Sequence, residues 1–358
     1  MIHELIAERR LPSLMTMNNG STVKTPDEWR ARRRELLDLL SREEYGYTPA
    51  APAAVRATVE SSDPVFGGKA LKRRIRLSFD TPGGEFSFPF TLLLPKAAHP
   101  APAFVYVAFR PDVPDIYLPA EEIIDHGFAV ADIFYKDVTD DSANVDGLAA
   151  MYPRDPATGW GKIGMWAFAA SRVLDYLETC DEIDSARVCV SGHSRLGKTA
   201  LWCAAQDERF AMAVSNDSGC SGAAISRGKV GESIDAITDP ERFHYWFCGN
   251  YRAWANRESD APFDQHMLLS MLAPRALYVS SAQEDEWADP RSEYLCCAAA
   301  SDAWQLLRTP GLHASDALPQ INAPLHEGGV AYHIRTGSHY HNRTDWLWQM
   351  AYREKHHI

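Results

Sequence analysis

The stretch from Arg187 to Lys198 (Arg-Val-Cys-Val-Ser-Gly-His-Ser-Arg-Leu-Gly-Lys) constrains the fold of this chain more than any other segment. Its apolar run at 188–190 is typical of a strand that is covered on both faces. A serine in a tight turn follows, and residues 196–205 predict a helix. This order indicates a nucleophile elbow, which places a serine hydroxyl at the carboxyl edge of a sheet, beside the free N–H groups of a helix. Ser194 is the predicted nucleophile. The alternative is a plain strand-to-helix turn with a capping serine.

Antiparallel strands come first in the predicted order of elements, and strand–helix pairs follow. Runs at 55–60, 71–79 and 86–94 are strand-like, and the last two flank Thr81-Pro-Gly-Gly84, which predicts a hairpin. Further strands are expected at 103–109, 128–133, 188–190, 210–215, 276–280 and 330–335. Helices are expected at 27–44, 163–179, 196–205, 264–272, 291–307 and 345–355.

This order predicts an α/β protein with the α/β-hydrolase fold: a three-layer sandwich with a central, mostly parallel sheet, an N-terminal helix and an antiparallel hairpin. The sequence contains no internal repeat, low-complexity tract or linker. We therefore expect a single catalytic domain over residues 1–358, with an N-terminal helical segment at 1–50 and the hydrolase core at 51–358.

Charge and hydropathy exclude two classes of partner. The formal net charge is −12, and the longest basic cluster, Arg30 to Arg34, is most simply a solvated helix face. Nucleic acid is therefore not an expected partner. No apolar run approaches the roughly 20 residues that a membrane span needs, so no membrane partner is expected.

Cysteine usage and the first residues favour the cytoplasm. The seven cysteines are odd in number and form no CxxC pair, which suits reduced, mostly buried thiols better than a disulfide framework. The first ten residues carry acids and lack the apolar core and cleavage site of a signal peptide. We therefore expect a cytoplasmic protein, although a secreted chain whose leader had been removed would have the same features.

A serine nucleophile requires an imidazole base whose tautomer is fixed by a carboxylate. In the predicted fold, both groups follow the serine along the chain, on loops after late strands. His339, in Thr336-Gly-Ser-His-Tyr-His-Asn342 after the last expected strand, is the first candidate for the base. The alternatives are a surface histidine or a metal pair with His341. We expect no metal, because no cysteine or carboxylate cluster nearby completes a ligand set.

Two residues compete for the role of the acid. Asp285 follows the strand that ends at Ser280, which is the ordinary place for the acid in this fold, although other acids at 284, 286 and 289 lie close to it. Asp217 lies one strand after the elbow, in Ser-Asn-Asp-Ser-Gly, a sequence that also favours a turn or a helix cap.

Two cations accompany the predicted nucleophile. Arg195 is adjacent to Ser194, where a guanidinium can stabilise a developing oxyanion or pair with an anionic substrate. Lys198 lies at i+4 on the same helix face. Together they suggest a substrate with a carboxyl-derived group or many hydroxyls; surface salt bridges are the alternative. Trp287 and the aromatic residues at 246–251 form either a sugar-stacking surface or plain core.

These residues resemble those of the glucuronoyl esterases, and the bacterial branch above all. Gly192-His-Ser-Arg-Leu-Gly-Lys198 is similar to the family motif Gly-x-Ser-Arg-x-Gly-Lys, in which the second glycine is delayed. Matching blocks occur around Trp166, Asp217, Trp287 and His339, and the resemblance covers roughly residues 100–355.

The resemblance implies a serine esterase that hydrolyses esters of (4-O-methyl-)glucuronic acid in xylan-derived or lignin–carbohydrate substrates. It implies a Ser-His-acid triad, an acyl-enzyme, no cofactor, and a small-molecule or oligosaccharide uronate ester as the partner. The roles that it implies are nucleophile for Ser194, base for His339, oxyanion stabilisation for Arg195, sugar-hydroxyl binding for Lys198 and uronate contact for Trp287.

The acid differs within the family. Fungal members carry a glutamate where Asp217 stands, and some bacterial members use the later loop, which favours Asp285 and keeps Asp217 as a partner or substitute. The sugar-binding glutamine and glutamate of the fungal members have no clear counterpart around Glu232 to Tyr245.

Two other functions stay open. One is an acetyl-xylan-type or general carboxylesterase with the same triad, in which a small acyl group would give Arg195 and Lys198 less reason to converge. The other, of a different class, is a non-catalytic carbohydrate-binding pseudoenzyme, against which the intact Ser194 and His339 argue.

Overall fold

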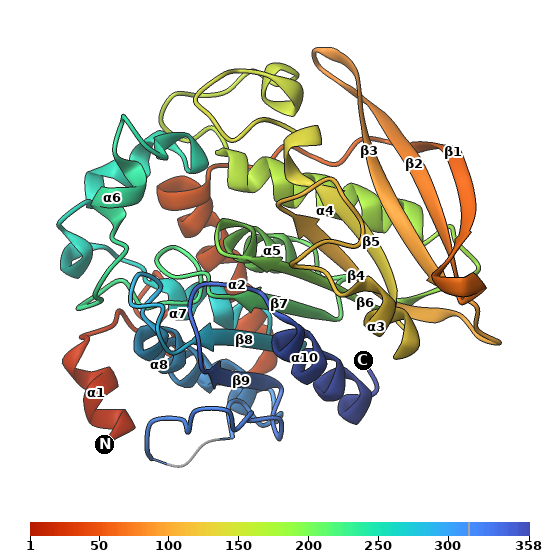
Figure 1. Ribbon diagram of the computed structural model, residues 1–358. Helices are drawn as coiled ribbons and strands as arrows, with labels where there is room; N and C mark the ends of the chain where they lie inside the picture. Colours follow the sequence, from red (N-terminus) through yellow and green to blue (C-terminus); the bar gives the residue numbers. More distant parts are fainter. Residues whose placement is uncertain (314–315) are drawn as a thin grey trace.

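A mixed sheet of nine strands forms the centre of the part of the chain that the computed structural model describes, residues 1–313 and 316–358 (Figure 1). Its spatial order is β1-β2-β3-β5-β4-β6-β7-β8-β9. The pairs from β1 to β5 are antiparallel, whereas the neighbours from β5 onward are parallel. The strands are β1 (Arg56–Val65), β2 (Ala70–Thr81), β3 (Gly84–Pro95), β4 (Ala101–Ala108), β5 (Ala129–Phe134), β6 (Ile183–His193), β7 (Met212–Asn216), β8 (Ala276–Ala282) and β9 (Val330–Arg335).

Helices cover both faces of the sheet and complete three layers. The strand β4 shows this by alternation: Val105 and Val107 belong to one hydrophobic cluster, while Phe104 and Tyr106 belong to another. The first cluster contains residues of α2, α4, α5, α7 and α8, and the second contains residues of α3 and α10. The helices are α1 (Ile2–Glu8), α2 (Pro26–Leu40), α3 (Ala120–Asp125), α4 (Lys162–Leu177), α5 (Arg195–Gln206), α6 (Ile234–Thr238), α7 (Gln265–Ser270), α8 (Pro290–Ala300), α9 (Asp302–Leu306) and α10 (Arg343–His356).

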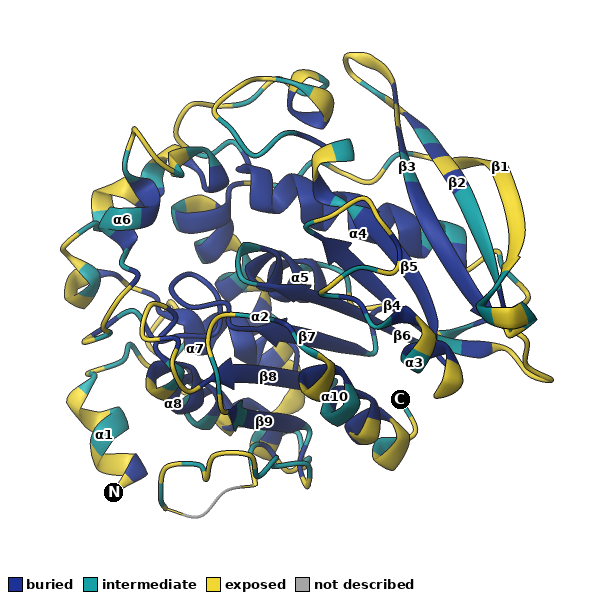
Figure 2. Cartoon of the chain, viewed as in Figure 1, coloured by how far each residue is buried: buried dark blue, intermediate teal, exposed yellow. Residues whose placement is uncertain are grey.

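The predicted mostly parallel sheet and the hairpin are confirmed. Thr81 pairs with Gly84 across the turn between β2 and β3. The edge strand β1 is exposed along almost its whole length (Figure 2). Among the described residues, no helix combines the length and the apolar character that crossing a membrane requires.

Several boundaries differ from those expected. The elbow strand is longer than the apolar run at 188–190, because β6 begins at Ile183. The helix expected at 291–307 breaks at Ser301, whose hydroxyl donates to the Cys297 carbonyl at 2.8 Å and accepts the Leu312 N–H at 2.8 Å. The short helix α1 carries too weak a periodicity to be predicted from sequence.

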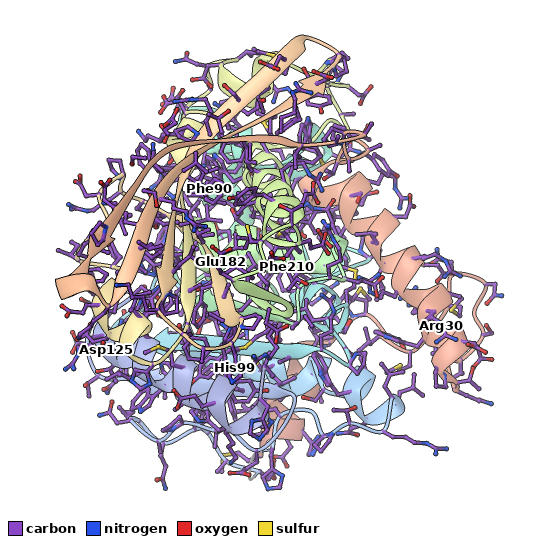
Figure 3. All side chains as sticks on the ribbon, turned by 90° about the vertical axis from the view of Figure 1, so that its right-hand side faces the viewer. Arg30, Phe90, His99, Asp125, Glu182 and Phe210 are labelled. Carbon is purple, nitrogen blue, oxygen red and sulfur yellow. The ribbon has the colours of Figure 1, made fainter. Side chains whose placement is uncertain are left out.

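The arginine cluster of α2 is not the solvated helix face that the sequence suggested. Arg30 and Arg34 are exposed, but Arg32 and Arg33 are buried. Figure 3 shows Arg30 on the outer helix, away from Phe90 in the interior. The buried guanidinium groups fix α2 against the rest of the fold.

Arg33 binds the ends of two other helices. Its guanidinium donates to the carbonyl oxygens of Ala205 at 2.7 Å and Met271 at 2.9 Å, and pairs with Glu208 at 2.8 Å. Ala205 lies in the last turn of α5, and Met271 caps α7. Carbonyls at helix ends lack partners within the helix, so Arg33 supplies the donors that they need.

We predict that Arg33→Met lowers the free energy of unfolding by about 2–4 kcal/mol, because it removes the guanidinium that donates to two buried carbonyls. Arg34→Met is the matched control: Arg34 lies on the same helix, is exposed and makes no ion pair with any described residue. Its effect should stay within about 0.5 kcal/mol. Urea denaturation measures both, and equal effects would contradict the assigned role of Arg33.

Candidate active site

Ser194 lies at the turn between β6 and α5, with φ 57° and ψ −129°. Its N–H donates to the Asn216 carbonyl at 2.8 Å, and its carbonyl accepts the Gly197 N–H at 2.8 Å. The first N–H groups of α5 have no acceptor within the helix. The half-buried serine therefore lies at the carboxyl edge of the sheet, beside N–H groups that α5 leaves free.

The two glycines of the motif have different functions. A Cβ at Gly192 would meet the Leu196 carbonyl oxygen at 2.1 Å, so only glycine allows α5 to begin this close to β6. A Cβ at Gly197 would come within 3.0 Å of Ser218 Cβ and 3.1 Å of Ser215 Oγ. Leu196 itself is fully buried in the core, which explains why glycine stands at 197 and leucine at 196.

The loop after β9 brings His339 to Asp285, which follows β8. His339 Nδ1 lies 2.6 Å from Asp285 Oδ2. The Asp285 side chain is 2% exposed and that of His339 is 39% exposed. The His339 ring is also 4.5 Å, between centroids, from that of His193, the neighbour of Ser194. Because Asp285 engages Nδ1, Nε2 is the nitrogen that remains for a hydroxyl or a water.

His193 is a neutral spacer between the elbow and the base. Burial, followed by the nearby rings of His339 and His341, lowers the pKa of His193 well below its usual value. Its Nδ1 lies 2.6 Å from Asn216 Oδ1, which fixes the ring. A neutral ring in this place adds no positive charge beside the predicted base.

Asp217 is buried beside this pair, with φ 46°. Its carboxylate accepts the Ala282 N–H at 2.7 Å and the Tyr340 N–H at 3.4 Å, and lies 3.6 Å from the Arg335 guanidinium. Among the described residues it makes no hydrogen bond with His339. Burial, and then the carboxylates of Glu293, Asp345 and Asp285, raise the pKa of Asp217 well above its usual value. The geometry therefore favours Asp285 as the partner of His339.

Asp217, Asp285 and His339 offer donor atoms that all lie within 4.8 Å of one another. These atoms are engaged within the protein: Asp285 and His339 bind each other, and Asp217 binds backbone N–H groups. In the metal pair considered for His339 and His341, the Nε2 of the buried His341 is already engaged, 3.2 Å from Gln349 Oε1.

Arg335 holds the loop that carries His339. Its guanidinium donates to the carbonyl oxygens of Thr336 at 3.1 Å and Ser338 at 3.3 Å, and to that of Tyr340. It is anchored by Asp345, with Arg335 Nε 2.8 Å from Asp345 Oδ2. These carbonyls flank His339 on both sides, so the loop conformation depends on this buried arginine. No local signal in the sequence indicates this contact.

Arg195 is enclosed rather than free. It pairs with Asp141, and its guanidinium carbon lies 4.7 Å from the ring centroid of Trp246. Asp141 is held in turn by the Trp246 indole N–H at 2.8 Å and by the Tyr135 hydroxyl at 3.3 Å. The guanidinium is thus fixed beside the elbow, and Asp141 is a site residue that the sequence did not reveal.

Lys198 is buried at i+4 from Ser194. Its ammonium donates to Glu232 Oε2 at 2.8 Å and to the Ser218 carbonyl at 2.6 Å. Glu232, to which the sequence analysis assigned no role, is therefore the partner of Lys198. Trp287 has a side chain that is 45% exposed, so it belongs to the surface and not to the core.

We predict that Gly192→Ala destabilises the protein by about 1–3 kcal/mol, because the new methyl group overlaps the backbone of the elbow. The displaced serine should cost about 100-fold or more in kcat, since small misplacements of reacting groups are that costly. Gly164→Ala, inside α4, is the control, because its Cβ would meet Trp160 Cβ at an ordinary 3.5 Å. Thermal unfolding and ester hydrolysis measure both. A Gly192→Ala protein with wild-type kcat would contradict this view of the elbow.

A second prediction concerns the His339 loop. Arg335→Lys keeps the charge that Asp345 faces but loses the planar fork that reaches three carbonyls. We expect kcat to fall at least about tenfold with KM changed little, because the base is misplaced while the substrate surface stays intact. The control is Arg343→Lys, because Arg343 is exposed on α10, where it pairs with Glu122. This substitution should leave kcat unchanged. Wild-type kcat in folded Arg335→Lys would show that the Arg335 guanidinium does not position His339.

A family model described as glucuronyl esterase of fungi matches residues 77–308. A carbohydrate esterase from an unidentified prokaryotic organism is 32% identical over 94% of this chain and 87% of its own length. A 4-O-methyl-glucuronoyl methylesterase of Wolfiporia cocos is 30% identical over 85% of this chain and 74% of its own length. The solved glucuronoyl esterase from Solibacter usitatus superposes with a TM-score of 0.88 at 34% identity, over 96% of this chain and 97% of the other.

These relatives correct one expectation. The glucuronoyl esterases are secreted, extracellular enzymes, so the predicted cytoplasmic location is wrong. Cysteine usage was the wrong basis for predicting the compartment. All seven are free, but six are buried and the seventh is partly buried. Packing alone protects such thiols from oxidation, so their reduced state says nothing about the compartment.

The predicted α/β-hydrolase fold is confirmed by the superposition, and the predicted enzyme class by the family. The chain belongs to the glucuronoyl esterase family and is a carboxylic ester hydrolase.

Proposed function

We propose that this enzyme hydrolyses esters of (4-O-methyl-)glucuronic acid, with Ser194 as nucleophile, His339 as base and Asp285 as acid. The observation that carries the proposal is the 2.6 Å contact of His339 with Asp285 beside an elbow serine, in a member of this family. The substrate class is supported by curated relatives named 4-O-methyl-glucuronoyl methylesterases. We also infer that the chain folds as one catalytic domain, since residues of α1 and α2 join the same hydrophobic cluster as those of α4 and α5.

The first half-reaction is acyl transfer. Ser194 Oγ attacks the uronoyl carbonyl carbon while His339 Nε2 takes the hydroxyl proton. Asp285 holds the ring in the tautomer that leaves Nε2 free, and its charge stabilises the imidazolium that forms. Collapse of the tetrahedral intermediate breaks the ester C–O bond, and His339 returns the proton to the departing alcohol. The product is a uronoyl ester on Ser194.

The second half-reaction reverses these roles with water. His339 Nε2 removes a proton from a water molecule as its oxygen attacks the acyl carbon, and then returns that proton to Ser194 Oγ. The uronic acid is released and the serine is restored. The exposed face of His339 is consistent with this step, because water must reach Nε2.

Charge develops on the carbonyl oxygen in both steps. The N–H of Arg195, the residue after the nucleophile, and its guanidinium are the groups to which we assign the stabilisation of that oxygen. The pairing of Arg195 with Asp141 and its contact with Trp246 fix the guanidinium before the substrate binds, so little reorganisation is needed during the reaction.

The sugar-binding roles are assigned to the groups around Lys198. The Lys198 ammonium has three N–H donors, and two of them bind acceptors among the described residues. One donor is therefore left for a sugar hydroxyl. Glu232 Oε1 is a possible acceptor beside it, and the exposed Trp287 offers a ring face for the pyranose. A polyhydroxylated acyl group suits this pair better than an acetyl group does.

Hydrolysis of benzyl glucuronate by active-site variants tests the proposal. We expect Ser194→Ala to lower kcat at least about 10⁴-fold and Asp285→Asn by about 10²- to 10⁴-fold. Asp217→Asn should stay within about tenfold of wild type, because Asp217 binds the backbone N–H groups of Ala282 and Tyr340 and not His339.

Circular dichroism and thermal unfolding serve as the control that all three variants are folded. A larger loss in Asp217→Asn than in Asp285→Asn would move the role of the acid to Asp217. Full activity of Ser194→Ala would contradict the serine mechanism, and a wild type that labels with a fluorophosphonate but cleaves only acetyl esters would point to a general carboxylesterase.

A further inference from the structure

A pocket of about 500 Å³ lies between the segment 143–160 and the segment 244–249. Tyr245 lines this pocket, and its hydroxyl donates to the Asp141 carbonyl at 2.9 Å. The carboxylate of the same Asp141 pairs with Arg195, the neighbour of Ser194. Tyr245 and Asp141 therefore connect the wall of the pocket to the residue beside Ser194. None of the roles assigned above uses the pocket.

The walls of the pocket are held together by backbone contacts. The Asn250 N–H donates to the Ala157 carbonyl at 2.9 Å. A Cβ at Gly249 would meet the Pro156 oxygen at 2.2 Å, and one at Gly161 would meet the Trp246 oxygen at 2.0 Å. The two segments thus approach as closely as glycine permits, and the space between them is formed before any ligand arrives.

The wall nearest the reaction centre is fixed by a buried lysine. Lys162, at the start of α4, donates to the carbonyl oxygens of Asp140 at 2.6 Å and Asn144 at 2.9 Å. Its ammonium lies 5.6 Å from the centroid of the Tyr245 ring. All of these polar groups are used to build the wall, and none of them supplies a counter-charge to the pocket.

Arg154 is the uncompensated cation of this pocket. It lines the space and is partly buried, and it makes no hydrogen bond or ion pair with any residue in the described ranges. Burial alone lowers the pKa of Arg154, and no acid offsets it. The adjacent Asp155 also lines the pocket, but its Oδ1 accepts the N–H groups of Ala157 and Thr158 within its own turn. A guanidinium in such a place lacks the anion that its fork fits.

The remaining lining indicates the kind of anion. Tyr152, Trp160 and Tyr245 bring aromatic rings to the pocket, and its volume lies in the range of small-molecule sites. Flat rings pack on the apolar face of a pyranose, while a guanidinium pairs with a carboxylate through two parallel hydrogen bonds. The chain as a whole carries a formal charge of −12, so an anion here would be held by the local cation and not by the overall field.

We propose that this pocket is a subsite for a second, unesterified uronate of an acidic oligosaccharide, with Arg154 binding its carboxylate while the esterified uronate lies at Ser194. The inference rests on the proposed function and deepens it: the preferred substrate is an oligosaccharide with more than one uronate, not an isolated ester. It also gives the enzyme a way to recognise the carbohydrate chain independently of the alcohol that leaves.

The test compares two substrates that differ in one charge. Each is a xylo-oligosaccharide with one benzyl-esterified glucuronate and a second glucuronate branch, which is a free acid in one substrate and the neutral amide in the other. We expect wild type to have the lower KM for the free acid, by about tenfold. Arg154→Gln should abolish this ratio of KM values, and added salt should reduce it in wild type.

Arg34→Gln is the matched control, because it removes the same charge from an exposed arginine on α2 and should keep the wild-type ratio. Equal KM values for acid and amide in wild type, or an unchanged ratio in Arg154→Gln, would overturn the proposal. Calorimetry of the two unesterified oligosaccharides binding to Ser194→Ala tests the subsite without turnover. Tighter binding of the acid that requires Arg154 supports the subsite, even if the wild type cleaves no ester. A wild type that cleaves no ester would refute only the proposed function.

Discussion

The backbone of Ser194 is the constraint on which the rest of the site depends. A non-glycine residue at φ 57° is strained by about 1–2 kcal/mol, and it persists only where its surroundings determine it. Here Gly192 lets α5 start in contact with β6, and the hydrogen bond from Ser194 to the Asn216 carbonyl holds the turn from the neighbouring strand. The buried core around α5 therefore fixes a hydroxyl that the sheet presents at its edge.

The cationic side chains around this hydroxyl are each paired with a carboxylate. Arg195 pairs with Asp141, Lys198 with Glu232, and Arg335 with Asp345. Breaking a buried pair is costly, because the remaining charge has no solvent, so Lys198 and Arg335 stay in place. Arg195 is 25% exposed and is held by Asp141 and by the ring of Trp246. Asp217 has a different environment: burial, and then the neighbouring carboxylates, raise its pKa, although the Arg335 guanidinium lies 3.6 Å away. Asp285, hydrogen-bonded to His339, is thus the acid with a defined partner.

The sheet, the hairpin and the elbow could be predicted from the sequence because their signals are local. Apolar runs such as 188–190 and the turn at 81–84 are read within a few residues. The residues that position the site could not be predicted in this way. Asp141, Glu232 and Arg335 come from segments far from Ser194 along the chain, and only the fold brings them together. Similarly, the choice between two candidate acids depends on a single distance, that of His339 to Asp285. We expected Arg33 at the surface, because the periodicity of its own helix does not show which other helix ends pack against it.

In the proposed function, the paired cations around Ser194 select a uronoyl group as the acyl part of the ester. The most direct measurement is the ratio of kcat/KM for benzyl glucuronate to that for p-nitrophenyl acetate in the wild-type enzyme. We expect a ratio well above one, despite the better leaving group of the acetate ester, because the proposed role of Lys198 and Glu232 is to bind hydroxyls that acetate lacks. A ratio below one, with both activities lost in Ser194→Ala, would contradict it: the triad would stand, but the uronate would not be the substrate.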